Sequence, residues 1–202
     1  MSETLNPFAI DADTLSGMKP LRPVVLSLGS NLGDRLANLQ GALMALRETP
    51  DLFIVDVSSV WETEPWSPNQ TQSPNQAHGD GGRDVSQDPA FLNVVVLAET
   101  NQEPLTMLDR TMAIEDAFGR TRGEANAPRT LDVDLIVMGK VEMDQPALQL
   151  PHPHAHERAF VLAPWVEIEP KADLPGHGPI QDLLAKVDSS TVKRREDLAL
   201  ED

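Results

Sequence analysis

Two aspartates separated by one residue, with an arginine just before them, are the residues of this sequence best placed to do chemistry. They are Asp132 and Asp134, and the arginine is Arg129, all within the segment PRTLDVDLI. Because residues i and i+2 of a β-strand point to the same face, the two carboxylates are expected to project together, with Leu131, Val133 and Leu135 facing a core. The alternative is an edge strand with a polar face.

A divalent cation resolves the repulsion between two neighbouring carboxylates. Mg²⁺ takes oxygen ligands and is typically held by one or two carboxylates together with substrate phosphates. Arg129 is then expected to clamp a phosphate through its planar fork of donors. The pair therefore predicts a metal and phosphate site.

A local group of positive charge precedes the aspartates. Arg120, Arg122 and Arg129 lie within ten positions of one another in a chain whose formal net charge is −16. An acidic protein that binds an anion has to concentrate its positive charge locally, so these arginines are candidate polyphosphate ligands. The alternative is that Arg120 and Arg122 complement the dipole of a helix that stops near Gly119.

A carboxylate on the preceding helix is a further candidate. The pattern predicts a helix over about residues 103–118, and Glu115 lies three residues after Met112 and seven after Leu108, in the register of its buried face. Glu115 is therefore expected at the edge of the core, where it would bond a ligand or orient an arginine. The alternative is the frayed polar end of the helix.

The segment PHPHAHER, residues 151–158, carries three histidines at alternate positions. Alternating histidines can bind Zn²⁺, but zinc sites with no cysteine or carboxylate nearby in the sequence are a minority, and the two prolines restrict the local geometry. A single histidine that contacts a phosphate, together with Arg158, fits the segment better.

Composition limits the class of protein. The chain has 202 residues, 22.1 kDa and 40% hydrophobic residues, which indicates one globular domain. It has no cysteine, which excludes disulfides, thiolate metal sites and cysteine nucleophiles. Strong acidity argues against nucleic acid as a partner, and no apolar run approaches the roughly 20 residues of a membrane helix. With no secretory signal pattern at its start, the chain is expected in the cytoplasm.

The remaining pattern predicts the elements that position these residues. Strands are expected at 23–28, 52–61, 91–99 and around the two aspartates, with one helix after Asp34 and another over 103–118. This βαββαβ order predicts a ferredoxin-like α+β fold with a mainly antiparallel sheet and helices on one face. The expected domain is residues 21–185, with a flexible leader at 1–20, a long polar mobile loop at 67–89 and a charged tail at 186–202 without a clear core face.

A carboxylate pair, several arginines and a mobile loop are the parts that phosphoryl transfer needs. The glycine-rich turn at Gly29–Gly33 is not followed by Lys and Ser or Thr, so it is not a Walker loop. Any nucleotide is therefore expected to bind by another scheme.

Five segments together resemble the 6-hydroxymethyl-7,8-dihydropterin pyrophosphokinases of folate synthesis, over roughly residues 23–170. They are LGSNLG from Leu28, SSVWETEP from Ser58, FLN from Phe91, PRTLDVD from Pro128 and PHPH from Pro151. The resemblance implies transfer of the β,γ-pyrophosphoryl group of ATP to the hydroxymethyl group of the pterin, with release of AMP. It agrees with the ferredoxin-like core.

The resemblance also implies residue roles. Asp132 and Asp134 would hold two Mg²⁺ ions against the triphosphate, with Arg120 and Arg129 as catalytic phosphate ligands. The implied ATP contacts are Glu115, Arg120, Arg122, Arg129, His152, Arg158 and backbone groups near Ile136. The implied pterin contacts are Thr63, Pro65, Trp66, Phe91, Asn93 and Phe160, with the pterin between the two phenylalanines. The alternative for Phe91 and Phe160 is ordinary core. Other enzymes of the folate pathway are candidate partners.

Two departures from the family pattern stand out. The family usually has an arginine and a tryptophan just before its Pro-Arg-Thr-Leu-Asp segment, where this chain has Glu124, Ala125, Asn126 and Ala127, one residue fewer. Arg122 is the candidate to compensate. The loop at 67–89 is also longer than usual.

Two other functions are open from the sequence. One is a ferredoxin-like domain that binds pterin or nucleotide without catalysis, which the missing arginine and tryptophan favour. The other is a different Mg²⁺-dependent phosphotransferase, if the pocket around Asn93 is unsuited to pterin. The carboxylate pair with Arg129 favours the pyrophosphokinase, because a protein that only binds pterin needs no metal site.

Overall fold

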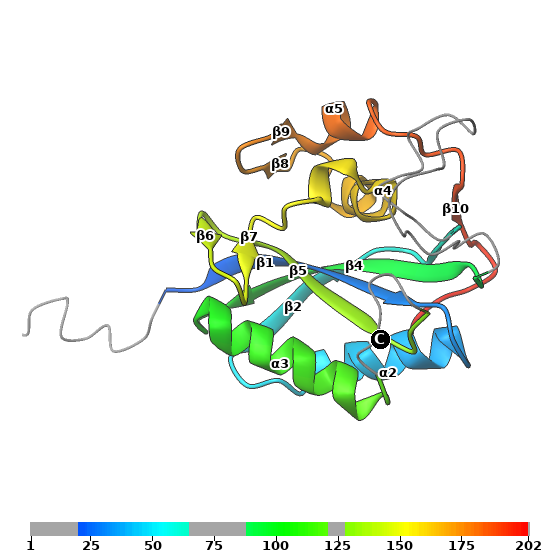
Figure 1. Ribbon diagram of the computed structural model, residues 1–202, viewed down its shortest axis with the longest axis horizontal. Coiled ribbons are helices and arrows are strands. Elements are labelled where there is room, and N and C mark those ends of the chain that lie inside the picture. The colour runs from blue at the N-terminus through cyan, green and yellow to red at the C-terminus, as the bar shows by residue number, and fades with distance from the viewer. Residues whose placement is uncertain (1–19, 65–87, 121–127, 202) are drawn as a thin grey trace, which may run out of the picture.

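Six strands form one antiparallel sheet in the part of the chain that the structure describes, residues 20–64, 88–120 and 128–201 of a computed structural model (Figure 1). The strands are β1 (Arg22–Ser30), β2 (Leu52–Val57), β3 (Trp61–Thr63), β4 (Phe91–Thr100), β5 (Asp132–Met138) and β10 (Val192–Arg194). The helices are α2 (Arg35–Arg47), α3 (Pro104–Ala117), α4 (Ala159–Ile168), α5 (Ile180–Leu184) and the 3-10 helix η2 (Ala155–Glu157). Two short hairpins are β6 (Met143–Asp144) with β7 (Gln149–Leu150) and β8 (Asp173–Leu174) with β9 (Gly178–Pro179).

The strand order confirms the ferredoxin-like α+β fold. The core strands β1, β2, β4 and β5 are the four strands of the βαββαβ pattern. Their order in the sheet is β2-β4-β1-β5, so β1 lies between β4 and β5, and all pairs are antiparallel. The expectation of one strand over 52–61 is wrong, because β2 and β3 share one edge of β4 as two separate strands. Ser58, between them, still bonds Val95: its backbone N–H donates to the Val95 carbonyl, and its hydroxyl accepts from the Val95 N–H.

Helices cover both faces of the sheet, which corrects the expectation that they lie on one face. Helices α2 and α3 lie below the sheet in Figure 1, and α4 and α5 lie above it. A core that includes Leu28, Leu43 and Met107 fills the first interface. A second core, with Val95 and Trp165, fills the other. The apolar segment that begins at Ala159 thus forms the second layer.

The last part of the chain joins the sheet. Strand β10 pairs with β3, and Leu198 and Leu200 pack against the core on the α2 side. The expectation that the charged segment after Lys186 lacks a core face is therefore wrong. The expected leader at 1–20 and loop at 67–89 lie, except for Pro20, Asp88 and Pro89, outside the described residues.

Strand β5 alternates as its sequence predicts. Val133 and Leu135 are buried in the core on the α2 and α3 side, whereas Asp132 and Asp134 lie on the face that α4 covers and are partly exposed. The strand is also the edge of the sheet, as the alternative interpretation proposed. Its polar face is nevertheless not a plain solvated one, because Arg158, just before α4, bonds Asp134 there.

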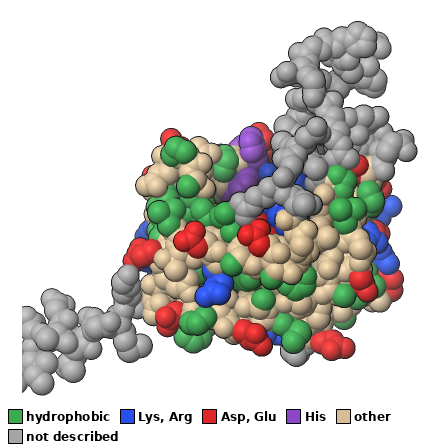
Figure 2. Space-filling model, turned by 60° about the horizontal axis from the view of Figure 1, so that its bottom comes forward, with side chains coloured by type: hydrophobic (Ala, Val, Ile, Leu, Met, Phe, Trp, Pro, Cys, Tyr) green, Lys and Arg blue, Asp and Glu red, His purple; other side chains and the backbone are tan. Residues whose placement is uncertain are grey.

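Acidic side chains are scattered over the surface that Figure 2 shows, and histidine and basic side chains lie next to one another in its upper part. Within the described ranges, the structure has no helix with the length and apolar character needed to cross a membrane.

Gly41 allows α2 and α3 to approach closely. A β-carbon on Gly41 would lie 2.5 Å from Cζ of Phe118, the residue that directly follows α3. Alanine favours a helix over glycine by about 1 kcal/mol, but overpacking typically costs about 1–3 kcal/mol. We therefore expect Gly41→Ala to lower the free energy of unfolding in urea by about 1 kcal/mol. In a Phe118→Leu background, where the clash is relieved, the same substitution should raise it; a loss of equal size in both backgrounds would contradict this explanation.

Candidate active site

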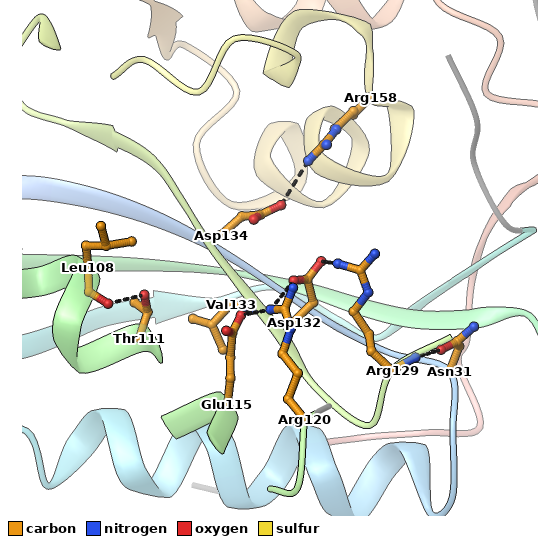
Figure 3. A network of polar contacts seen from close by, with 10 residues as sticks. All are labelled: Asn31, Leu108, Thr111, Glu115, Arg120, Arg129, Asp132, Val133, Asp134 and Arg158. Atoms are coloured by element: carbon orange, nitrogen blue, oxygen red, sulfur yellow. Dashed lines mark hydrogen bonds and ion pairs between the residues drawn. The ribbon is translucent and has the colours of Figure 1, made fainter. Parts of the chain in front are cut away.

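Three arginines converge on the aspartate pair (Figure 3). Arg120 and Arg129 bond the two oxygens of Asp132, with Nη1 of Arg120 at 2.7 Å from Oδ1 and Nη1 of Arg129 at 2.9 Å from Oδ2. Arg158, at the start of α4, bonds Oδ2 of Asp134 at 2.8 Å. Each carboxylate is thus neutralised by a residue from a different part of the chain. The site brings together five of the residues that the sequence singles out.

Glu115 orients one of these arginines. Its side chain is only 7% exposed and accepts hydrogen bonds from the Val133 N–H (2.8 Å) and from Arg120. Burial raises the pKa of Glu115, and the bonds from Val133 and Arg120 oppose that shift. The prediction that Glu115 would orient an arginine is confirmed, and the frayed-end alternative is wrong. Through Val133, the same carboxylate also fixes the start of β5.

The carboxylate of Asp134 ionises less readily than usual despite its partner Arg158. Burial, followed by repulsion from Asp132, raises the pKa of Asp134 to about 6, although Arg158 and Arg129 act in the opposite direction. A cation bound at the aspartate pair would act in the same direction as the two arginines.

Asn31 fixes the position of the backbone at Arg129, a role that the sequence did not indicate. Its Oδ1 accepts from the Arg129 N–H at 2.7 Å, its Nδ2 donates to the Pro89 carbonyl at 3.2 Å, and its own N–H donates to the Arg129 carbonyl. Its neighbour Ser30 bonds the Thr130 carbonyl at 2.6 Å. The turn after β1 thus positions the arginine segment from 98 residues away in sequence. The sequence feature that could have indicated this role is the Asn in a turn rich in Gly and Asn, because such an Asn, when buried, has to bond backbone groups.

A small cavity of about 140 Å³ lies on one side of the aspartates. Ser27 and Gly29 line it from the central strand β1, where a β-carbon on Gly29 would lie 3.0 Å from Oδ1 of Asn93. Its other lining residues include Thr63, Glu64, Phe91, Asn93, Arg158 and Phe160. Asn93 donates to the hydroxyl of Thr63 at 2.9 Å, and the guanidinium of Arg158 lies 5.6 Å from the Phe160 ring centre. Two partly exposed aromatic rings face a buried amide there, which is not ordinary core.

A larger cavity of about 700 Å³ lies on the other side. Helix α3, strand β5 and the β6–β7 hairpin line it, together with Glu115 and His152. Arg120 and Asp134 line both cavities, so these two residues mark the place where the cavities meet.

His152 faces the larger cavity as a neutral imidazole. Burial and the nearby charge of Arg158 lower the pKa of His152 to about 4. The His154 N–H donates to its Nδ1 at 3.2 Å, which leaves the proton on Nε2 as a donor. The His154 ring lies 6.3 Å from the His152 ring but pairs with Glu157 at 3.2 Å, and His156 stacks on His177 at 4.0 Å. A zinc site formed by the three histidines is therefore not what this segment builds.

Some predicted site residues cannot be placed. Pro65, Trp66 and Arg122 lie outside the described residues, as does the departure at residues 124–127. Ile136 is fully buried against the α4 side, its carbonyl accepts from the His152 N–H, and it lines neither of these two cavities.

The donor set at the junction fits Mg²⁺. Among residues 20–64, 88–120 and 128–201, no group of three or more histidines and carboxylates is arranged to hold a metal ion. A cation at Asp132 and Asp134 would therefore need water or phosphate oxygens as further ligands. Mg²⁺ is bound in this way in nucleotide sites, whereas structural zinc uses four protein ligands.

Comparison with known proteins decides the family. Residues 25–170 match the family described as 7,8-dihydro-6-hydroxymethylpterin-pyrophosphokinase, abbreviated HPPK. The chain belongs to the HPPK family. Two relatives are named 2-amino-4-hydroxy-6-hydroxymethyldihydropteridine pyrophosphokinase. The one from Methylorubrum extorquens is 36% identical over 171 residues, 85% of this chain and 97% of that protein. The one from Mycobacterium bovis is 38% identical over 178 residues, 82% of this chain and 84% of that protein.

Solved structures agree on the fold. A crystal structure of an HPPK-DHPS protein in complex with substrates superposes with a TM-score of 0.60 at 15% identity. It covers 82% of this chain, and this chain spans 44% of that longer protein. The HPPK-DHPS of Plasmodium falciparum, solved as a triple mutant with pteroate, also gives a TM-score of 0.60, over 89% of this chain and 48% of that one. At such low identity these structures support the HPPK fold alone.

Removing the Asn31 side chain should destabilise this HPPK-family protein. Asn31→Ala removes the partner of the Arg129 N–H at a part-buried position, whereas the carbonyl of the exposed Pro89 can bond water instead, so the free energy of unfolding should fall by about 1–3 kcal/mol. Asn101→Ala, at a partly exposed Asn just after β4, should change it by less than about 0.5 kcal/mol in the same denaturation experiment. Equal effects at the two positions would mean that Asn31 does not hold these segments.

Asp134→Asn should stabilise the ligand-free protein above pH 6. The pKa of Asp134 is about 6 in the folded protein against its ordinary value of 3.8, so ionisation costs stability as pH rises between these values. Asparagine escapes that cost, and the gain should be about 1–3 kcal/mol at pH 7.5 and should vanish near pH 4. Denaturation in EDTA at both pH values measures it, with Asp173→Asn as an exposed control. A pH-independent gain would contradict the electrostatic cause.

Proposed function

We propose that this chain transfers the β,γ-pyrophosphoryl group of ATP to the hydroxymethyl group of 6-hydroxymethyl-7,8-dihydropterin, producing the pterin diphosphate and AMP for folate synthesis. One observation carries the proposal: a carboxylate pair with three arginines stands where a large cavity and a small cavity meet. A transferase that joins two unlike substrates needs the reacting groups of both at one charged point.

The two cavities suit the two substrates. The larger has room for a nucleotide, and Arg120, Glu115 and the Nε2 donor of His152 line it on the side of the aspartates. The smaller, between Phe91 and Phe160, suits a flat bicyclic heterocycle. Asn93 donates one N–H to Thr63. Its amide keeps a second N–H and the oxygen to bond the polar edge of the heterocycle.

The arginines would exchange partners when substrates bind. The planar fork of arginine binds phosphate as well as carboxylate, so once a cation occupies the aspartates, Arg120, Arg129 and Arg158 would move from them to the triphosphate. They would neutralise the charge that develops on the transferred group. During transfer the pterin oxygen bonds the β-phosphorus, the bond from that phosphorus to the oxygen bridging to the α-phosphate breaks, and the hydroxyl proton leaves.

Asp132 and Asp134 would hold Mg²⁺, two ions in the full proposal. Mg²⁺, when bound, supplies charge neutralisation and orientation of the phosphate oxygens. The raised pKa of Asp134 supports this assignment, because a neighbouring cation relieves the repulsion from Asp132. A cytoplasmic location and association with other folate-pathway enzymes are predictions from the sequence that belong to the same proposal.

The test is the identity of the nucleotide product. Incubation with ATP, Mg²⁺ and the pterin should give AMP in equal amount to the pterin diphosphate, and Asp134→Ala should lower kcat by about 1,000-fold or more because phosphate charge is no longer neutralised. Asp173→Ala, an exposed carboxylate of β8, serves as the control and should retain wild-type kcat. ADP as product would indicate a different phosphotransferase. Pterin binding without turnover would indicate a domain that binds without catalysis.

A further inference from the structure

The C-terminal arm, residues 192–201, lies against the strand that carries part of the small cavity. Strand β10 pairs with β3 in the register Val192–Thr63, Lys193–Glu62 and Arg194–Trp61. Thr63, the last residue of β3, lines the cavity and accepts the hydrogen bond from Asn93. Strand β3 is only three residues long, so its position depends on the neighbours on its two edges.

A chain of charged hydrogen bonds links the arm to both sides of this cavity. Arg195 donates to Oε2 of Glu62 at 2.8 Å, and Arg35 donates to Oε1 of the same carboxylate at 3.0 Å. Arg35 also donates to the Ala90 carbonyl at 2.7 Å. Glu62 directly precedes Thr63, and Ala90 directly precedes Phe91. The Arg195–Glu62–Arg35 chain therefore holds the backbone next to a cavity-lining residue on β3 and on β4.

A second carboxylate fixes β3 from the α4 side. Glu167 on α4 accepts from the indole N–H of Trp61 at 2.9 Å and from the Ser59 hydroxyl at 2.6 Å. Arg194 of the arm lies 3.3 Å from the same carboxylate and bonds the Ser59 hydroxyl at 3.0 Å. Neighbouring arginines of the arm thus contact β3 through different acidic partners.

The rest of the arm is anchored on α2. Leu198 and Leu200 pack against the core, the Glu201 N–H donates to Gln40 at 2.7 Å, and Gln40 donates back to the Glu201 carbonyl at 3.0 Å. Arg47 donates to the same carbonyl at 3.2 Å. None of these residues lines the small cavity, so they hold the arm in place without contacting a ligand there.

We propose that the C-terminal arm positions the pterin side of the active site and that Arg195 is its positioning residue. Arg195 acts through Glu62 on Thr63, and through Glu62 and Arg35 on Phe91, and it contacts no substrate itself. The inference rests on the proposed function for the identity of the ligand. It gives the arm, residues 192–201, a role in substrate affinity in addition to stability.

The test compares substrate constants in Arg195→Ala, Arg195→Lys and Lys193→Ala. Lys193→Ala removes a positive charge that lies opposite Glu62 in the strand register but leaves the Arg195–Glu62 hydrogen bond, so it separates that bond from the charge near Glu62. Arg195→Ala should raise KM for the pterin about ten-fold, because a charge-assisted bond that positions Thr63 and Phe91 is lost, and should leave KM for ATP within about two-fold. Arg195→Lys keeps one contact to Glu62 and should raise KM for the pterin only about three-fold. Lys193→Ala should match the wild type.

The positioning role would be overturned if Arg195→Ala left KM for the pterin unchanged. It would also be overturned if KM rose equally for the pterin and for ATP, because a general loss of stability does not select one substrate. If Arg195→Ala is not recovered folded, the Arg195→Lys value decides in the same way. Equilibrium binding of the pterin, measured by fluorescence, separates the two levels of the argument. Wild-type protein that binds pterin without producing AMP sinks the proposed function, and the binding constants of the variants still decide on the arm.

Discussion

The repulsion between two half-buried carboxylates on one strand is the constraint around which this protein is organised. Asp132 and Asp134 cannot avoid each other, because their spacing on β5 projects both to the same face. The fold answers with Arg120 from the end of α3, Arg129 from the segment before β5, and Arg158 from the start of α4. Burial and the repulsion from Asp132 still raise the pKa of Asp134. A cation that binds the pair would oppose that shift.

The sheet gives this charged point two neighbours of different shape. On one side the central strand carries Ser27 and Gly29, whose small side chains leave a shallow space over β1 that Phe91 and Phe160 flank. On the other side the β6–β7 hairpin stands off from α3 and leaves the larger space. On the α4 face of the sheet, Val95 packs in the core beneath α4 and does not line the smaller space.

Precision in the site comes from polar residues that hold other site residues in place. Asn31 ties the arginine segment to the segment before Phe91. Glu115 ties Arg120 to the start of β5. Glu62 ties two arginines to the short strand β3. Each is a polar group whose partners are backbone atoms or opposite charges, and such bonds fix direction as well as distance.

The sequence by itself determined what local periodicity and residue chemistry can decide. The alternation in β5 predicted the shared face of Asp132 and Asp134, the helical register predicted an inward Glu115, and the order of elements predicted the ferredoxin-like sheet. Local patterns do not specify which distant backbone a side chain will meet. Only the tertiary structure could therefore show that Asn31 bonds Arg129, that α4 covers the second face, and that the charged end of the chain adds a strand beside Thr63. Those contacts join segments far apart in the chain, and their energies depend on burial that exists only after the sheet has formed.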